Sequence, residues 1–189
     1  MTAADHDPYL VSAFTLANRA RRFIWGIVYT LFFRFTPRPL HAWRCFLLRL
    51  FGAQRGPHCH IYPSARIWAP WNLRCAEQAT IAEDVVVYNP APLSLGSHAI
   101  VSQQAYLCGA THDYDSPAFP LISFPSTLGD YSWVCARAVV MPGVNLGEGA
   151  ILALGAVATR DLEPWMVYGG VPARKLKPRK RPDEAGPQQ

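Results

Sequence analysis

Residues 128–156 read LGDYSWVCARAVVMPGVNLGEGAILALGA, and this stretch decides the fold. An aliphatic residue returns every six positions, and a small or β-branched residue stands four places after each one. The aliphatic positions are Leu128, Val134, Val140, Leu146 and Leu152, and the small ones are Ser132, Ala138, Val144, Ala150 and Ala156. A period of six fits neither a helix nor an alternating strand. It predicts coils in which each hexad forms one short strand and one turn, and three hexads close a triangle.

The same period continues upstream in shorter runs. Aliphatic residues recur at this spacing in the sets Ile61, Ile67, Leu73; Ile81, Val87; and Leu95, Val101, Leu107. The steps from 73 to 81 and from 87 to 95 contain two extra residues each. We therefore expect a mainly β domain over residues 56–173, in which a buried aliphatic column contributes roughly 25 cal/mol per Å² of apolar surface.

Residues 1–55 form an N-terminal extension. Within it, residues 19–51 predict two helices that are separated by a proline-containing turn at 36–39. The first helix is apolar nearly all round and flanked by arginines, and its apolar run of eleven residues is too short to span a bilayer. Two interpretations stay open: residues 19–51 make peripheral contact with a membrane, or they pack on the main domain or on another subunit.

The charge is distributed unevenly along the chain. Residues 1–55 carry eight Arg and two Asp, residues 56–173 carry four Arg and nine acids, and residues 174–189 form a basic C-terminal tail. The acidic centre argues against a nucleic-acid partner. Five scattered cysteines without a CxxC pair argue against a disulfide framework and against structural zinc, so no metal is expected. We expect a cytoplasmic protein, with membrane association on the cytoplasmic face as the further expectation if the helices bind lipid.

The repeats resemble those of the hexapeptide-repeat acyltransferases, which form a left-handed parallel β-helix. The motifs VMPGV (140–144), GAVATRD (155–161) and YGGVPAR (168–174) are similar to those of the sugar O-acetyltransferase branch, which includes maltose and galactoside acetyltransferases. PSARIW (63–68) and THDY (111–114) resemble the colanic acid biosynthesis acetyltransferases. The resemblance covers roughly residues 19–178.

This resemblance implies both a fold and an activity. The fold is mainly β: a left-handed parallel β-helix of hexapeptide repeats with N-terminal α-helices and a protruding loop. The activity is acetyl transfer from acetyl-CoA to a hydroxyl of a sugar or glycan acceptor in exopolysaccharide biosynthesis. Proteins of this kind are homotrimers with three sites at subunit interfaces, so we expect a homotrimer.

The six-residue rhythm stops after Leu107, so residues 111–127 are expected to protrude as a loop. His112 stands at its start, and attack by a hydroxyl needs a base of near-neutral pKa. In the resembled family the histidine that opens this loop is the catalytic base, and the role carries over to His112. The alternative is a structural hydrogen bond within the loop. Asp113, Asp115 or a backbone carbonyl would orient the ring, and Asp113 is our candidate.

Two residues are candidates for the acceptor site. Tyr114 follows the histidine and could bound the acceptor pocket. Asn89 lies at an irregularity of the repeats and could donate a hydrogen bond to the developing oxyanion or to the sugar. The alternative for Asn89 is a turn before Pro90.

By motif position, the resemblance places six residues at the coenzyme A site: Trp133, Ala136, Thr159, Arg160, Arg174 and Lys177. Arginine and lysine suit phosphates, although the tail could also be a solvated basic run. Trp133 either walls the groove or caps the aliphatic column. Cys135 and Leu154 stand where the family usually has smaller residues, which leaves the path of the pantetheine arm open.

Three other functions stay open. A γ-class carbonic anhydrase needs three histidines on zinc, but His98 and His112 are fourteen residues apart and the loop has no second histidine. A trimeric scaffold without catalysis would need no histidine loop. The same chemistry could also act on an amino sugar, a serine or an antibiotic.

Overall fold

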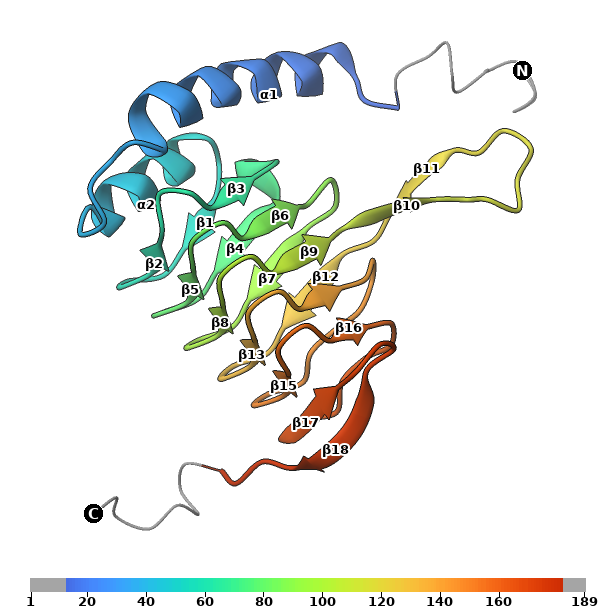
Figure 1. Ribbon diagram of the computed structural model, residues 1–189. Helices are drawn as coiled ribbons and strands as arrows, with labels where there is room; N and C mark the ends of the chain where they lie inside the picture. The colour runs from blue at the N-terminus through green and yellow to red at the C-terminus, as the bar shows by residue number, and fades with distance from the viewer. Residues whose placement is uncertain (1–12, 182–189) are drawn as a thin grey trace.

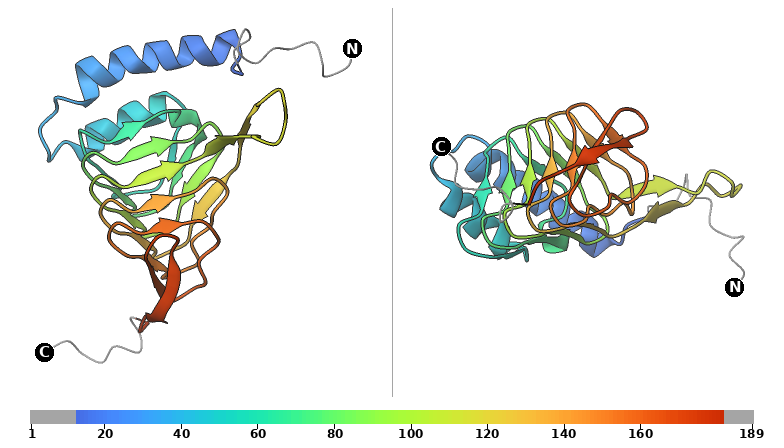
Figure 2. Two further views of the ribbon diagram at one scale, coloured as in Figure 1. Left: turned by 45° about the vertical axis from the view of Figure 1, so that its right-hand side comes forward. Right: turned by 90° about the horizontal axis from the view of Figure 1, so that it is seen from below.

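The structure is a computed structural model, and it describes residues 13–181. Its main body is a three-sided prism of short parallel strands stacked coil upon coil (Figures 1 and 2). The N-terminal helices cover one end of the prism, and a pair of C-terminal strands closes the other (Figure 1). This arrangement confirms the mainly β solenoid with N-terminal helices.

Each side of the prism is one sheet. Sheet A contains β1 (Gln54–Arg55), β4 (Leu73–Cys75), β7 (Leu93–Leu95) and β12 (Ser126–Leu128). Sheet B contains β2 (His60–Ile61), β5 (Thr80–Ile81), β8 (Ile100–Val101), β13 (Trp133–Val134), β15 (Ile151–Leu152), β17 (Met166–Gly169) and β18 (Arg174–Pro178). Sheet C contains β3 (Arg66–Ile67), β6 (Val86–Tyr88), β9 (Tyr106–Cys108), β14 (Val139–Val140) and β16 (Val157–Ala158). The chain runs A, B, C and back to A, so the prism has an A–B, a B–C and a C–A corner.

The register between coils explains the six-residue period. In sheet B, Ile81 pairs with Val101, Val101 with Val134, and Val134 with Leu152. All four side chains are 0% exposed, so each aliphatic residue packs on its equivalent in the next coil. The small residues lie at the corners, where Ala99, Ser132 and Ala150 are also 0% exposed at successive A–B corners. Burial of this column is the main stabilising term of the prism.

Two helical segments form the cap on the first coil. The segment α1 (Leu16–Val28) continues into one π-helical stretch, η1 (Tyr29–Phe33), and α2 (His41–Leu50) follows a turn. A short 3-10 helix, η2 (Pro70–Asn72), lies in the C–A corner of the first coil. The Trp25 indole Nε1 donates to the carbonyl of Ile67 at 2.7 Å, which ties α1 to sheet C.

Arg44 of α2 is 0% exposed, and the backbone around it supplies most of its hydrogen-bond acceptors. Its guanidinium donates to the carbonyls of Ile61, Pro37 and Arg38 and to the Thr36 hydroxyl. Burial lowers the pKa of Arg44, because an apolar environment disfavours the charged form. One arginine therefore fixes the turn between the helices on the first coil of the prism.

The end of the chain contributes one more strand. β18 pairs antiparallel with β17 and extends sheet B (Figure 1). The basic tail predicted from residue 174 onward therefore begins as sheet rather than as free chain. Among the helices of the described residues, none combines the length and the apolar character needed to cross a membrane.

Candidate active site

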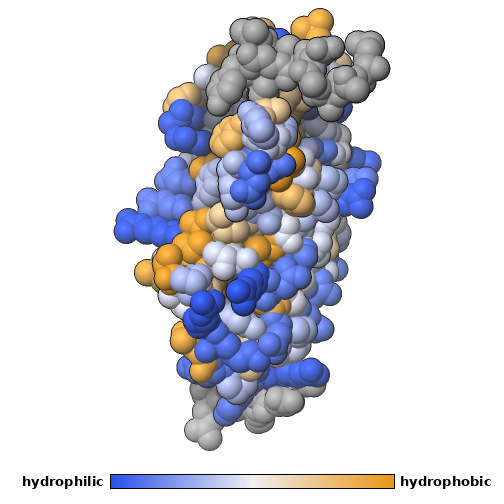
Figure 3. Space-filling model, turned by 90° about the vertical axis from the view of Figure 1, so that its right-hand side faces the viewer, coloured by the Kyte–Doolittle hydropathy of each residue, from blue (hydrophilic) through white to orange (hydrophobic). Residues whose placement is uncertain are grey.

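A hairpin interrupts the coils where the six-residue rhythm stops. β10 (Ala110–His112) pairs antiparallel with β11 (Leu121–Ser123), and His112 lies opposite Leu121. The hairpin leaves the C–A corner between β9 and β12 and projects from the prism (Figure 1). Seen from this side, the molecule shows apolar patches between strongly polar surfaces (Figure 3). The predicted loop thus has its own two-stranded stem.

The His112 side chain is exposed at the end of β10, and one carbonyl sets its orientation. Its Nδ1 lies 2.8 Å from the carbonyl oxygen of Phe119. A carbonyl only accepts hydrogen bonds, so the neutral ring carries its proton on Nδ1 and its lone pair on Nε2. The ring also stacks on the Phe119 side chain, with centroids 4.6 Å apart and an interplanar angle of 11°. This arrangement presents Nε2 as a base.

Phe119 contacts His112 through both its carbonyl and its ring, and the sequence did not reveal this contact. Its φ of +44° is in the left-handed region, which is unfavourable for a bulky residue. Its N–H donates to the carbonyl of Ser116 at 2.9 Å while its own carbonyl accepts from His112. Such strain persists where surrounding contacts fix the backbone, often at functional sites. No sequence signal distinguishes this phenylalanine from others in a proline-rich loop.

The neighbours of His112 shape the turn of the hairpin. The N–H of Asp113 donates to the carbonyl of Pro120 at 2.9 Å, and its carboxylate accepts from the N–H of Asp115 at 3.2 Å. In this structure the carbonyl of Phe119, not a carboxylate, meets Nδ1 of His112. The role of Asp113 in orienting the base therefore stays a prediction. Tyr114 is exposed and lies in the same turn.

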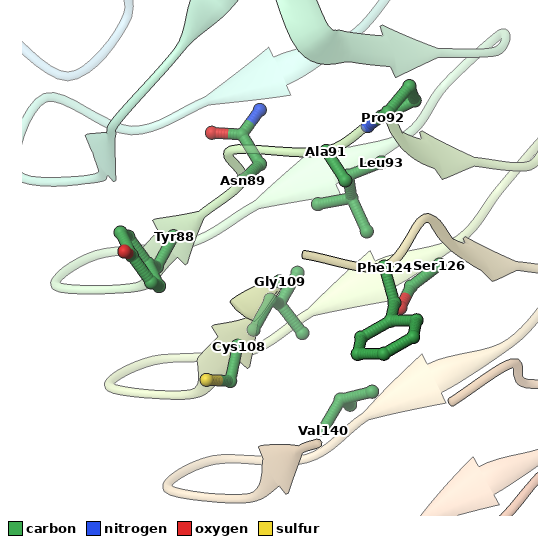
Figure 4. A pocket seen from close by; sticks show the side chains of 11 residues that line it. Tyr88, Asn89, Ala91, Pro92, Leu93, Cys108, Gly109, Phe124, Ser126 and Val140 are labelled. Atoms are coloured by element: carbon green, nitrogen blue, oxygen red, sulfur yellow. The ribbon is translucent and has the colours of Figure 1, made fainter. Parts of the chain in front are cut away.

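Asn89 lies at the base of the hairpin and is 1% exposed. Its amide oxygen accepts from the N–H of Ala69 at 3.0 Å, and its amide nitrogen donates to the carbonyl of Ala69 at 2.9 Å. Figure 4 shows this amide pointing toward the neighbouring coil, while Tyr88 and Cys108 point to another side. These bonds give Asn89 a structural role, and its contact with a substrate stays a prediction.

A groove of about 380 Å³ lies between α1 and sheet C, within the range of ligand pockets. Arg22, Tyr29, Arg66, Trp68 and Tyr88 contribute to its lining. The Arg22 guanidinium stacks on Trp68 at 4.4 Å from the ring centroid, and Trp68 meets Tyr88 edge to face at 5.5 Å. Burial raises the pKa of both tyrosines, which keeps them neutral hydrogen-bonding groups.

One residue, Tyr88, lies between this groove and the base of the hairpin. Tyr88 lines the groove and also lines a small cavity beside Cys108 and Gly109, which directly precede β10 (Figure 4). No sequence pattern indicated the groove, because its residues belong to a helix and to two coils that meet only in the fold.

The residues expected at the coenzyme A site lie on several parts of the prism. Trp133 is on the outer face of sheet B, where its Nε1 donates to the Ser102 hydroxyl at 2.8 Å. Ala136 is at the B–C corner, and its carbonyl accepts from Gly155 at 3.0 Å. The four remaining residues are exposed: Thr159 and Arg160 at the C–A corner, and Arg174 and Lys177 on β18.

One chain does not bring Trp133 and Ala136 to His112. The hairpin leaves the C–A corner, whereas Trp133 and Ala136 occupy sheet B and the B–C corner. Cys135 and Leu154 lie at that same B–C corner in successive coils. Leu154 is 74% exposed, and partial burial raises the pKa of the Cys135 thiol. Across residues 13–181, no three His, Cys, Asp or Glu side chains are grouped to hold a metal ion.

Comparison with known proteins agrees with this architecture. No protein-family model matches the chain. The chain is 34% identical over 156 residues to a protein of Escherichia coli K12 named as the colanic acid biosynthesis acetyltransferase WcaF, covering 82% of this chain and 86% of WcaF. The solved hexapeptide-repeat acetyltransferase of Vibrio cholerae in complex with acetyl-CoA has 26% identity and a TM-score of 0.77, covering 88% of this chain and 91% of that one. A galactoside acetyltransferase in complex with coenzyme A shares the fold at 19% identity and a TM-score of 0.79, covering 88% and 84% of the two chains.

The Escherichia coli relative covers 82% of the chain, and both solved structures share the prism. The chain belongs to the hexapeptide-repeat acetyltransferases and is an enzyme of that family.

Proposed function

We propose that the enzyme moves an acetyl group from acetyl-CoA to a hydroxyl of a sugar in exopolysaccharide or glycan biosynthesis, with His112 as general base. The contact of 2.8 Å between His112 Nδ1 and the Phe119 carbonyl carries this proposal, since it leaves Nε2 as the basic nitrogen. The ring is exposed on the hairpin, where an acceptor can reach it. A general base of this kind contributes typically 10²–10⁴-fold.

Transfer is direct. The acceptor hydroxyl gives its proton to Nε2 of His112 while its oxygen attacks the thioester carbonyl carbon. The ester C–O bond forms, the C–S bond breaks, and the proton passes from Nε2 to the departing sulfur, which gives free coenzyme A. The Phe119 carbonyl keeps its hydrogen bond from Nδ1 and stabilises the imidazolium in between. No covalent acetyl-enzyme is needed.

In this proposal, coenzyme A is bound by the residues that the family motifs indicate. Trp133 presents an indole face on sheet B, and Ala136 leaves space at the corner for a thin pantetheine arm. Thr159, Arg160, Arg174 and Lys177 are exposed and supply a hydroxyl and three cations for phosphates. Leu154 occupies part of the same corner, so the arm passes beside this side chain.

A homotrimer completes the site. Within one chain, His112 leaves the C–A corner, whereas Trp133 and Ala136 lie on sheet B and at the B–C corner; Thr159 and Arg160 share the C–A corner with the hairpin. In a closed ring of three prisms, the hairpin of one chain lies against sheet B and the B–C corner of the next. Each site then takes His112 from one chain and Trp133 and Ala136 from its neighbour.

The groove between α1 and sheet C is the site for the sugar. Trp68 and Tyr88 provide aromatic surfaces for the apolar faces of sugar rings, and Arg22 and Arg66 provide hydrogen-bond donors. Tyr88 joins this groove to the base of the hairpin that carries His112. In this proposal Tyr114 bounds the same acceptor site from the hairpin turn, and Asn89 fixes the coil beneath it. The five free cysteines fit a reducing compartment, so we place the enzyme in the cytoplasm.

The test is thiol release from acetyl-CoA with a panel of nucleotide-linked, lipid-linked and amino sugars. We expect one hydroxyl acceptor to raise turnover, and His112→Ala to lower it by at least about 10²-fold. Arg66→Gln should raise KM for that acceptor with little change in KM for acetyl-CoA. Turnover that survives in His112→Ala would overturn the role of the base. Turnover on an amino sugar alone would identify an N-acetyltransferase, and failure to bind acetyl-CoA would favour a scaffold.

A further inference from the structure

The outward face of α1 and η1 carries a row of exposed apolar side chains. Leu16, Phe23 and Ile27 of α1 and Leu31 of η1 follow one another at spacings of seven, four and four residues, which places them on one side of the helical segment. Their exposed fractions are 78%, 71%, 45% and 64%. We call these four residues the outer strip. An exposed apolar surface of this kind marks an interaction site.

The fold does not use the outer strip to hold the helix in place. Trp25, Tyr29 and Phe33 point the other way, pack on one another and attach α1 to the prism. Trp25 and Phe33 are buried, whereas the strip residues are not. The helix is therefore apolar on two sides, and only the inner side has a partner within the described part of the chain.

The helical cap that carries the outer strip is rich in arginine. Residues 13–76 contain ten arginines and no aspartate or glutamate. Arg19 lies on α1, Arg34 follows η1 and Arg49 lies on α2, and none of the three forms an ion pair within residues 13–181. Arg38 is different, because it pairs with Glu83 of the second coil. An apolar strip among cations that lack acidic partners matches a surface that is apolar inside and anionic outside.

We propose that the outer strip docks on an anionic phospholipid bilayer. Phe23, Ile27 and Leu31 enter the boundary between headgroups and acyl chains, and the arginines meet lipid phosphates. A second copy of this chain is a poorer occupant, because a symmetric contact through α1 would bring two arginine-rich surfaces together without acids to compensate. The contact is peripheral, since no described helix is long and apolar enough to cross.

Docking in this way would place the acceptor groove at the membrane. A hollow of about 430 Å³ along the outer strip is lined by Phe23, Ile27 and Leu31, and it shares Arg22 and Gly26 with the groove between α1 and sheet C. Gly26 has open space where a side chain would stand. A glycan anchored to lipid therefore reaches the groove by passing over Gly26. The passage of a lipid-anchored glycan to the groove rests on the proposed function, whereas the docking on the bilayer does not.

Flotation with lipid vesicles tests the docking. We expect the full chain to float with phosphatidylcholine vesicles that contain one quarter phosphatidylglycerol, and to stay behind with phosphatidylcholine alone or at high salt. Phe23→Ser together with Ile27→Ser should weaken flotation at least about tenfold. The matched control is Leu176→Ser, an exposed apolar residue on β18 at the other end of the prism.

Two results would overturn the docking: equal flotation of the wild type and the double variant, or no flotation of the wild type with anionic vesicles. A double variant that loses its oligomeric state in gel filtration would assign the strip to a second copy instead. Thermal melting confirms that the variant is folded. Thiol release with a water-soluble acceptor, measured without vesicles, separates this proposal from the proposed function. The loss of thiol release in His112→Ala under these conditions tests the proposed chemistry without any contribution from a membrane.

Discussion

The coils and the β10–β11 hairpin meet at one corner but are held in place by different kinds of contact. In the coils, side chains such as Ile81, Val101 and Val134 are 0% exposed, and each packs on its equivalent in the next coil. In the hairpin, His112 is exposed and is positioned by one carbonyl and one ring. Stability therefore comes from many repeated contacts, and the proposed chemistry depends on a few local ones.

This difference predicts that activity and stability respond to different substitutions. A change in the hairpin should lower turnover while the prism stays folded, because few buried contacts are lost. A change in the column or at Arg44 of the cap should lower the free energy of unfolding, while the folded fraction keeps its turnover per molecule. Variants of the two regions can test this separation directly.

The largest effect is expected at His112. His112→Ala should lower kcat by about 10²–10⁴-fold, because it removes the only group proposed to accept the hydroxyl proton. Its melting temperature should stay within about 1 °C of the wild type, since the side chain is exposed. Steady-state kinetics and calorimetry on the same samples measure both quantities.

The control for this variant is His98→Asn, another histidine outside the hairpin. His98 lies at an A–B corner, stacks on Tyr131 at 4.8 Å and has a φ of +58°, which asparagine tolerates. It should leave kcat unchanged. Equal losses in both variants would mean that any disturbed histidine lowers activity, and the assignment of the base would fail.

Arg44 should give the largest loss of stability. Arg44→Met removes the donors for the buried carbonyl of Ile61 and for the part-buried carbonyls of Pro37 and Arg38. Leaving them unsatisfied should cost about 3–5 kcal/mol of unfolding free energy. Denaturant titration measures this, with Arg49→Met of the same helix as the exposed control. A loss below about 1 kcal/mol would show that the cap is not fixed to the first coil through this side chain.

A substitution in the column should have the next effect. Ile81→Ala leaves a cavity between the first and third coils and should cost about 2–5 kcal/mol. Ile100→Ala, at an outward-facing position of the next coil, should cost less than about 1 kcal/mol. If the two variants lost equal stability, the column would not be the main source of stability. Thiol release per folded molecule should be unchanged in Ile81→Ala.

The sequence predicted the coils because each coil repeats the same packing requirements at the same spacing. The inward positions of sheet B from Ile61 to Leu152 repeat the same requirement for an aliphatic side chain, so spacing alone was enough to place Val134 and Leu152 in the column. The protruding segment was also predicted, since the period stops there. The two-stranded stem and the strained Phe119 were not, because both depend on contacts between residues that share no period.

The residues of the candidate site were predicted only in part, because most of them do not follow the six-residue period. His112 stands in the THDY motif at the start of the loop, and the prediction of its role came from the resemblance of that motif. The groove between α1 and sheet C was missed, because Arg22 and Trp68 are far apart in sequence and meet only after α1 folds over the first coil. Asn89 was found by its place in the chain, but its buried bonds to Ala69 could not be read from spacing.

The smallest effect is expected at Phe119, and it separates the carbonyl from the ring. Phe119→Gly keeps the backbone carbonyl that accepts from His112 Nδ1, and glycine adopts a φ of +44° without steric cost. Only the stacking at 4.6 Å is lost. We therefore expect kcat to fall by less than about tenfold, since an aromatic pair contributes about 0.5–1.5 kcal/mol. If Phe119→Gly lost as much activity as His112→Ala, the ring rather than the carbonyl would hold the base in its working orientation.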